Sequence, residues 1–114
     1  MISVDEIRSY VLTLPETVEV EHWGKPSFRI KNKIFVVLQE DGRTLTVKTI
    51  GDDRAIYTEL DPTTYRIPDA YAKLSYMHMN INQVEPEEAR GLIYKAWSSV
   101  APKRLVNRKP GTMS

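Results

Sequence analysis

The sequence contains no cysteine, which excludes disulfide bonds and zinc sites with thiolate ligands. Disulfide-free chains are typical of a reducing compartment, so we expect a cytoplasmic protein. The N-terminal residues lack the basic start and apolar run of a secretory signal, and no apolar stretch reaches the roughly 18 residues of a membrane span. These absences predict a domain that folds in water and makes no contact with a membrane.

Motifs for catalysis and for cofactor binding are also lacking. The glycines are dispersed, without a Gly-x-Gly or Walker pattern, so we expect no nucleotide cofactor. His22 and His78 are the only histidines, and neither has a hydroxyl or carboxylate residue at a spacing that assembles a catalytic triad. Glu19 and Glu21 share one face of an alternating strand while His22 points away, which disfavours a metal site. We therefore predict that the chain is not an enzyme and holds neither a metal nor a cofactor.

The net charge of +1 conceals an uneven distribution along the chain. Residues 91–114 carry several basic residues and no acidic one. No carboxylate lies between Glu21 and Glu40, an interval that creates a local positive field on a nearly neutral protein. The cations in this interval are Lys25, Arg29, Lys31 and Lys33.

Helical patterns lie at both ends of the chain. Ser3 and Glu6 have the spacing of a capping box for a helix over residues 4–14. Pro86, followed by two glutamates, begins a second helix, and residues 103–106 are expected to add a further turn. The apolar stripe of the second helix is Ala89, Leu92, Ile93, Ala96, Trp97 and Val100.

A third, short helix is predicted to follow the break at Gly51-Asp52-Asp53 and to end at Leu60. Asp52 or Asp53 would cap its N-terminus. Its apolar residues Ala55, Ile56 and Leu60 are expected to face inward.

Alternating and apolar runs predict an antiparallel meander over residues 18–23, 27–31, 33–39 and 44–50. Gly24-Lys25-Pro26, Asn32 and Asp41-Gly42 supply the turns, and the dense run at residues 34–38 indicates a central strand. Another strand is expected over residues 73–81, with Met77, Met79 and Ile81 on one face. Residues 61–72 read as a loop with at most a short extended piece at residues 65–67.

This order of elements predicts an α+β fold. We expect a single compact domain over residues 1–106, an antiparallel sheet of about five strands, and N- and C-terminal helices packed on one of its faces. Residues 107–114 are expected to form a mobile tail. The predicted core contains Ile7, Val11, Phe28, Ile30, Phe35, Val37, Leu92, Ile93 and Trp97.

Three stretches carry a resemblance to a known family. They are Gly24-Lys25-Pro26-Ser27-Phe28-Arg29 leading into Lys33-Ile34-Phe35, the strand before Val84-Glu85-Pro86, and Ala96-Trp97 through Arg104-Leu105. In sequence and spacing, the chain resembles the MmcQ/YjbR family over nearly its whole length. The resemblance implies a fold similar to frataxin-like and secretion-chaperone-like proteins. It also implies DNA binding, with two β-hairpin wings as the contact surface.

The chain departs from the family pattern at two places. Tyr76 stands where the family usually has Trp, which keeps an aromatic ring but adds a hydroxyl that needs a partner. Residues 61–72 match nothing in the pattern. Iron binding of the frataxin type does not carry over, because the first helix has no acidic ridge.

Two functional hypotheses follow. In the first, a basic β-hairpin contacts DNA phosphates, with Arg29 and Lys31 on one strand face. In the alternative, the Met-rich strand at residues 73–81 is the surface of a non-enzymatic protein–protein interaction module. The indole of Trp97 is expected in the core, whereas Trp23 is left open as a binding aromatic. The predicted nucleic-acid contacts are Lys25, Arg29, Lys31, Lys33 and Lys48.

Overall fold

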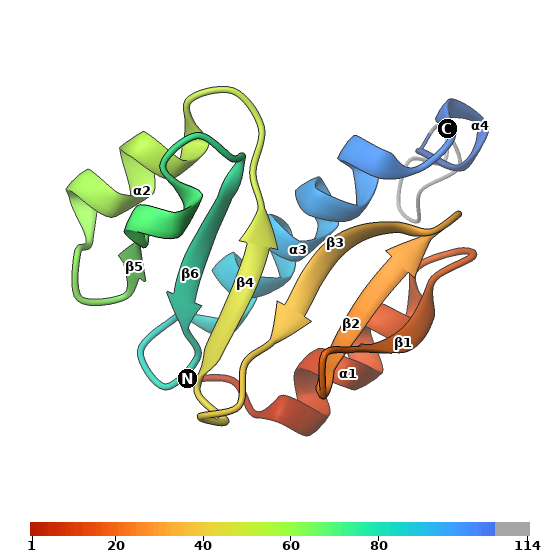
Figure 1. Cartoon of the computed structure of the whole chain (residues 1–114), viewed down its shortest axis with the longest axis horizontal. Coiled ribbons are helices and arrows are strands. Elements are labelled where there is room, and N and C mark those ends of the chain that lie inside the picture. Colours follow the sequence, from red (N-terminus) through yellow and green to blue (C-terminus); the bar gives the residue numbers. More distant parts are fainter. Residues whose placement is uncertain (107–114) are drawn as a thin grey trace.

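The computed structural model describes residues 1–106, so the tail predicted at residues 107–114 lies outside the described residues. Six strands form one antiparallel sheet in the order β1-β2-β3-β4-β6-β5 (Figure 1). The elements in chain order are α1 Val4–Thr13, β1 Val18–His22, β2 Lys25–Ile30, β3 Lys33–Leu38, β4 Thr44–Lys48, α2 Asp53–Leu60, β5 Tyr65–Arg66, the 3₁₀ helix η1 Asp69–Tyr71, β6 Tyr76–Asn80, α3 Pro86–Val100 and α4 Lys103–Val106.

Helices α1 and α3 lie together behind the sheet in Figure 1, which confirms the predicted arrangement. The capping box at the start of α1 is present: Ser3 Oγ accepts from the Glu6 N–H at 3.0 Å, and the Ser3 N–H donates to Glu6 Oε1 at 2.9 Å. Trp97 Nε1 on α3 donates to the carbonyl oxygen of Pro15 at 3.1 Å. This bond ties α3 to the end of α1.

The core fills the space between the sheet and these helices. Alternation along β2, β4 and β6 sends every second side chain to this face. Strand β3 carries a bulge, because Phe28 pairs with Val36 while Arg29 pairs with Ile34, which leaves Phe35 as an extra residue. All nine predicted core residues are buried, and the dense run in β3 reflects the bulge, which buries Phe35 and Val36 in succession.

Val37 is buried on the opposite face from the helices. It pairs with Ser27 on one side and Thr46 on the other, and both of those residues point away from α1 and α3. The prediction that Val37 is buried is confirmed. It lies on the face away from the helices because the bulge shifts the alternation of β3 by one residue.

Three expectations from the sequence are wrong. Strand β1, whose alternation predicts only one solvated face, has no buried face: Val18 is 52% and Val20 39% exposed, and Glu19 on the other side is exposed and pairs with Arg8 of α1. The three residues expected to face inward from α2, Ala55, Ile56 and Leu60, are exposed. Helix α2 packs against the rest of the domain through Tyr57 instead, whose ring lies edge-on to Tyr65 with the ring centroids 5.2 Å apart. Asp52 is the N-cap residue of α2, but its side chain makes no capping hydrogen bond.

The Met-rich strand offers no exposed methionine surface. Met77 and Met79 are fully buried on β6, and Ile81 is 2% exposed just beyond it. Because β6 lies between β4 and β5, its helix-side residues belong to the continuous core. Met77, Met79 and Ile81 are therefore not the exposed contact surface that the alternative hypothesis expects.

Two hairpin turns use residues with positive φ. Lys31 and Asn32 connect β2 to β3 with φ values of 49° and 67°, as the turn at Asn32 predicted. Trp23 and Gly24 connect β1 to β2 with φ values of 54° and 81°, so this turn comes earlier than the expected Gly24-Lys25-Pro26. Positive φ at both central residues is the type I′ pattern, which matches the twist of the flanking strands.

Candidate functional site

The face of the sheet that points away from α1 and α3, here called the open face, carries no acidic strand residue. Its members follow from the register, in which Val20, Ser27, Val37, Thr46, His78 and Arg66 lie side by side across the strands. The complete set is Val18, Val20, His22, Lys25, Ser27, Arg29, Ile34, Val37, Thr44, Thr46, Lys48, Arg66, Tyr76, His78 and Asn80.

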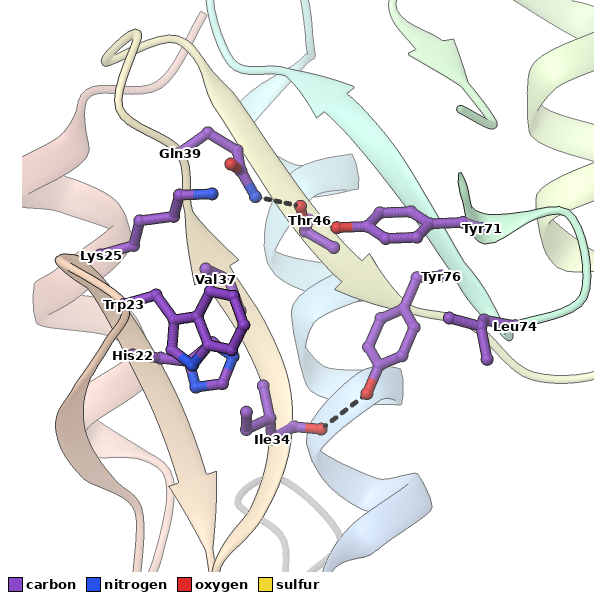
Figure 2. Close-up of a pocket in the computed structure, with 10 residues that line it drawn as sticks. All are labelled: His22, Trp23, Lys25, Ile34, Val37, Gln39, Thr46, Tyr71, Leu74 and Tyr76. Carbon is purple, nitrogen blue, oxygen red and sulfur yellow. Dashed lines mark hydrogen bonds between the residues drawn. The ribbon is translucent and has the colours of Figure 1, made fainter. Parts of the chain in front are cut away.

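A groove of about 250 Å³ crosses the open face. One wall is the β1–β2 hairpin with His22, Trp23 and Lys25, and the other is the segment around η1 with Tyr71 and Leu74. Figure 2 shows Trp23 and Tyr71 on opposite sides of the floor, with the ring of Tyr71 directed toward Thr46. The floor is formed by Ile34, Val37, Gln39, Thr46 and Tyr76.

Trp23 is the most exposed large apolar residue of the described chain, at 89%. Its backbone lies in the left-handed region, which a bulky side chain rarely adopts. The indole stacks on the ring of His22 with centroids 5.8 Å apart and planes inclined by 30°. The hairpin therefore presents an aromatic surface at the rim of the groove.

Arg29 holds His22 beneath this indole. The guanidinium donates to Ser27 Oγ at 3.1 Å and to Asn32 Oδ1 at 3.0 Å, and its third contact is His22 Nδ1 at 3.3 Å. A guanidinium has only donors, so in this contact Nδ1 is the acceptor. Arg29 is thus a fixed cation that orients the aromatic pair.

Tyr76 forms the far end of the floor, and Lys48 pairs with it on the neighbouring strand β4, outside the groove lining. The Tyr76 hydroxyl donates to the carbonyl oxygen of Ile34 at 3.3 Å, which supplies the partner expected for a Tyr at this position. Burial raises the pKa of Tyr76 above its ordinary value, so this hydroxyl stays a neutral donor. Lys48 Nζ lies 5.4 Å from the centre of the same ring, within cation–π range.

The η1 wall is fixed by Arg54 on α2. The guanidinium donates to the carbonyl oxygens of Tyr71 and Ala72, each at 2.7 Å, and of Tyr76 at 3.1 Å. These bonds join the segment after β5 to the start of β6. Sequence reasoning missed this wall because no motif links Arg54 to carbonyl groups about twenty residues away.

His78 lies beside this wall with both ring nitrogens buried and without a hydrogen-bond partner among residues 1–106. The ring meets Tyr71 edge-on at 5.3 Å. Desolvation, together with nearby Arg66 and Lys25, lowers the pKa of His78 against the opposing effect of Asp41. Neither His78 nor His22 forms a hydrogen bond to a hydroxyl group or a carboxylate within the described chain.

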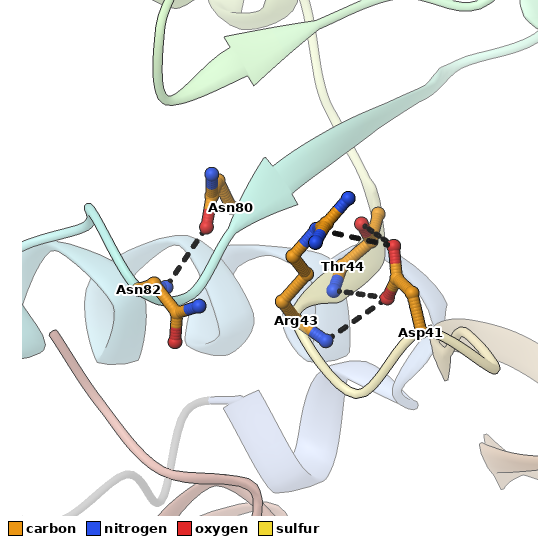
Figure 3. Close-up of polar contacts among 5 residues, drawn as sticks. All are labelled: Asp41, Arg43, Thr44, Asn80 and Asn82. Carbon is orange, nitrogen blue, oxygen red and sulfur yellow. Dashed lines mark hydrogen bonds and ion pairs between the residues drawn. The ribbon is translucent and has the colours of Figure 1, made fainter.

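The β3–β4 turn closes one end of the open face (Figure 3). Asp41 Oδ1 accepts from the N–H groups of Arg43 and Thr44, both at 2.9 Å, and Asp41 Oδ2 accepts from Thr44 Oγ1 at 2.7 Å. These hydrogen bonds lower the pKa of Asp41. Asn80 Oδ1 similarly accepts from the Asn82 N–H at 3.0 Å, so the polar groups in Figure 3 stabilise turns.

The structure divides the predicted contact set into two groups. Lys25, Arg29 and Lys48 lie on the open face. Lys31 lies in the β2–β3 turn, which corrects its expected place on a strand face beside Arg29. Lys33 pairs with Ile30, so the register places it on the helix side at the end of β3. Among the described residues, none of these five cations forms an ion pair with a carboxylate.

The part of the chain that the structure describes contains neither a metal-binding cluster nor a membrane-spanning helix. Residues 1–106 contain no group of three His, Asp or Glu side chains that could hold a metal ion. No helix within the same residues has the length and apolar character needed to cross a membrane.

Comparisons with known proteins agree with the fold. A family model described as YjbR matches residues 12–99. The crystal structure of Deinococcus radiodurans protein DR2400, which carries the family-model domain DUF419, superposes with a TM-score of 0.81. That chain is 16% identical, and the superposition covers 100% of this chain and 96% of the other, so the similarity shows the fold alone. No curated protein matches this sequence.

Proposed function

The chain belongs to the YjbR family, and on that premise we propose that it binds DNA, contacting phosphates through cations of the open face. Lys25, Arg29 and Lys48 form the central contact set, and Lys31 and Lys33 extend it at the β2–β3 turn. The protein acts by binding and not by catalysis. The observation that supports this proposal is a set of cations without carboxylate partners on a face without acidic strand residues.

The protection of sheet edges does not account for these cations. Lysines often blunt an edge strand against aggregation, and β1 is one edge of this sheet. Yet β1 has the sequence Val-Glu-Val-Glu-His and contains no Lys or Arg. Lys25 and Lys48 instead lie on β2 and β4, each of which has a strand on both sides. A role in binding an anionic partner explains that placement.

The two lysines also span the face. Lys25 is at the end of β2 next to the β1–β2 turn, whereas Lys48 is at the opposite end of the sheet, where β4 pairs with Tyr76. A polyanion that lies across the open face from one end of the strands to the other meets a cation at each end. Binding by such contacts releases counterions, so affinity falls steeply as salt rises.

Anisotropy titrations of labelled DNA at two salt concentrations test this function. Phosphate contacts alone predict weak binding, with a dissociation constant on the order of 10⁻⁴ to 10⁻⁶ M at physiological salt. The double variant Lys25→Gln/Lys48→Gln should weaken binding. The slope of log affinity against log salt should become less negative by about 1.4 to 1.8, which corresponds to the loss of two phosphate contacts.

The matched control removes two cations from the helix side. Arg90→Gln/Lys95→Gln has the same net charge as the test variant, but both of its residues lie on α3 and pair with carboxylates. This control should keep the wild-type slope. Equal slopes for both double variants would mean that net charge, and not the open face, governs binding.

A further inference from the structure

The groove on the open face carries an aromatic surface that phosphate contacts alone do not use. We infer that it binds single-stranded nucleic acid and holds an unstacked base against Trp23 and Tyr71. This inference rests on the proposed function, because the same lysines contact the backbone of the strand. The inference goes beyond the proposed function because it specifies the class of nucleic acid that is bound and the residues that select this class.

The first support is the position of Trp23. Turns of two residues with positive φ at both positions strongly favour Asn-Gly or Asp-Gly, yet this one reads Trp-Gly. The indole is 89% exposed, so burial does not explain a residue that the backbone disfavours. Strained positions of this kind cluster at binding sites, where the side chain is needed more than the local fit.

The second support is the shape of the groove. A cleft of about 250 Å³ between two aromatic walls is too small for a duplex, whose bases are stacked inside the helix. Proteins read a duplex by inserting a helix or a ribbon into one of its grooves. An aromatic platform at the side of a basic channel is instead the arrangement that binds single strands, because every base has a face that can stack.

The third support is the polar floor between the walls. Gln39 Nε2 donates to Thr46 Oγ1 at 2.8 Å, and both residues line the groove. The side-chain carbonyl oxygen of Gln39 has no hydrogen bond among residues 1–106, so it can accept from a donor on a base. Lys25 lines the same groove, and its cation lies within reach of the backbone phosphate of that nucleotide.

Charge favours this occupant over an apolar peptide or an uncharged ring compound. Lys25 and Lys48 lie at opposite ends of the open face without a carboxylate partner in the described chain. A neutral ligand in the groove would desolvate Lys25, which lines it, without compensation. A strand with phosphates on both sides of the stacked base supplies the missing anions.

The test compares four labelled oligomers of one length by anisotropy: single-stranded dT, single-stranded rU, duplex DNA and an abasic deoxyribose-phosphate strand. The abasic strand presents the phosphates without bases. Base stacking predicts that dT or rU binds about 5- to 150-fold tighter than the abasic strand and tighter than the duplex. The tighter of dT and rU identifies the sugar that the site accepts, and either one supports the inference.

Variants then locate the stacking surface. Trp23→Asn should lower dT affinity to the abasic level, leave abasic binding unchanged and keep the salt slope, since the phosphate contacts are intact. Tyr71→Leu should cause a smaller loss of the same kind. Leu60→Asn is the matched control, because it removes an apolar side chain that is 77% exposed on α2. In addition, dT should quench wild-type tryptophan emission but not that of Trp23→Asn, whose remaining Trp97 is buried.

The outcomes separate the two proposals. Equal affinity for dT and the abasic strand, equal affinity for duplex and single strand, or an unaffected Trp23→Asn would overturn the stacking site while leaving salt-dependent phosphate binding intact. No binding to any of the four oligomers at low salt would overturn both.

Discussion

The two faces of the sheet differ in the burial and the ion pairing of their side chains. On the helix side, the apolar core is buried and several charges at the margin are paired, as in Arg8 with Glu19 at 3.0 Å and Arg104 with Glu16 at 2.8 Å. On the open face, cations lack carboxylate partners within residues 1–106 and a tryptophan lies in solvent. One face therefore stabilises the fold, and the other offers unsatisfied charge and aromatic surface to a ligand.

The largest expected effect on stability comes from Trp97, the tryptophan on the helix side of the sheet. Trp97→Ala should lower the free energy of unfolding by about 3 to 5 kcal/mol, because the ring is fully buried and its N–H is bonded to Pro15. Urea denaturation measures this loss. A loss below about 1 kcal/mol would place Trp97 among ordinary surface residues and would erase the distinction between the faces.

A smaller loss is expected where the core meets the surface. The Tyr65 hydroxyl donates a short hydrogen bond to Glu88, and burial followed by this bond raises the pKa of Tyr65 well above its usual range. Tyr65→Phe should cost about 0.5 to 1.5 kcal/mol, the net contribution of one hydrogen bond, since the exposed carboxylate of Glu88 can then bind water. Denaturation of Glu88→Gln should give a similar or smaller value, because the amide oxygen still accepts.

The helix-side face was largely predictable from the sequence, and the reasons are local. The capping box at Ser3, Pro86 at the first position of α3 and the stripe through Trp97 each act within a few residues, so their consequences can be derived without knowing the fold. The helix-side residues of β2, Phe28 and Ile30, follow from alternation alone. The face that each residue of β3 occupies could not be derived from the sequence, because the bulge at Phe35 depends on how β3 pairs with β2.

The open face was only partly predictable, because its site depends on contacts between distant segments. The sequence indicated Lys25, Arg29 and Lys48 as cations of one surface, but their relation to an aromatic groove depends on the pairing of β4 with β6 and on Arg54 holding the η1 segment. No local pattern encodes either contact. A signal for Trp23 was present: a Trp-Gly pair between two strands departs from the Asn-Gly preference of such turns.

The third prediction concerns an effect that is confined to acidic pH. The folded-state pKa of His78 is lowered, so below the ordinary value of about 6.5 the unfolded chain binds a proton that the folded chain resists. Stability should therefore be unaffected above that pH and fall as the pH drops from about 6.5 toward the folded pKa.

Denaturation midpoints of wild type and His78→Gln between pH 5 and 8 measure this linkage. The variant should lose the pH dependence over the acidic half of this range, because Gln does not titrate. His22→Gln is the matched control on the same face and should retain it. An identical acidic decline in wild type and His78→Gln would assign the effect to other groups.

The smallest expected effect has the opposite sign, and it tests why the open face contains Trp23. Trp23→Asn creates the Asn-Gly pair that a type I′ turn favours. It also removes a bulky side chain from a position with left-handed backbone conformation. Little packing is lost in return, since the indole contacts chiefly His22. The free energy of unfolding should rise by a few tenths to about 1 kcal/mol.

Gly24→Ala is the opposing control and should destabilise the protein, because Ala is strained at a φ of 81° although no atom lies near the added Cβ. A variant that is more stable yet has lost its preference for unpaired bases would show that Trp23 serves the ligand at the expense of the turn. A loss of more than about 0.5 kcal/mol would instead mean that the indole packs on the sheet and belongs to the fold.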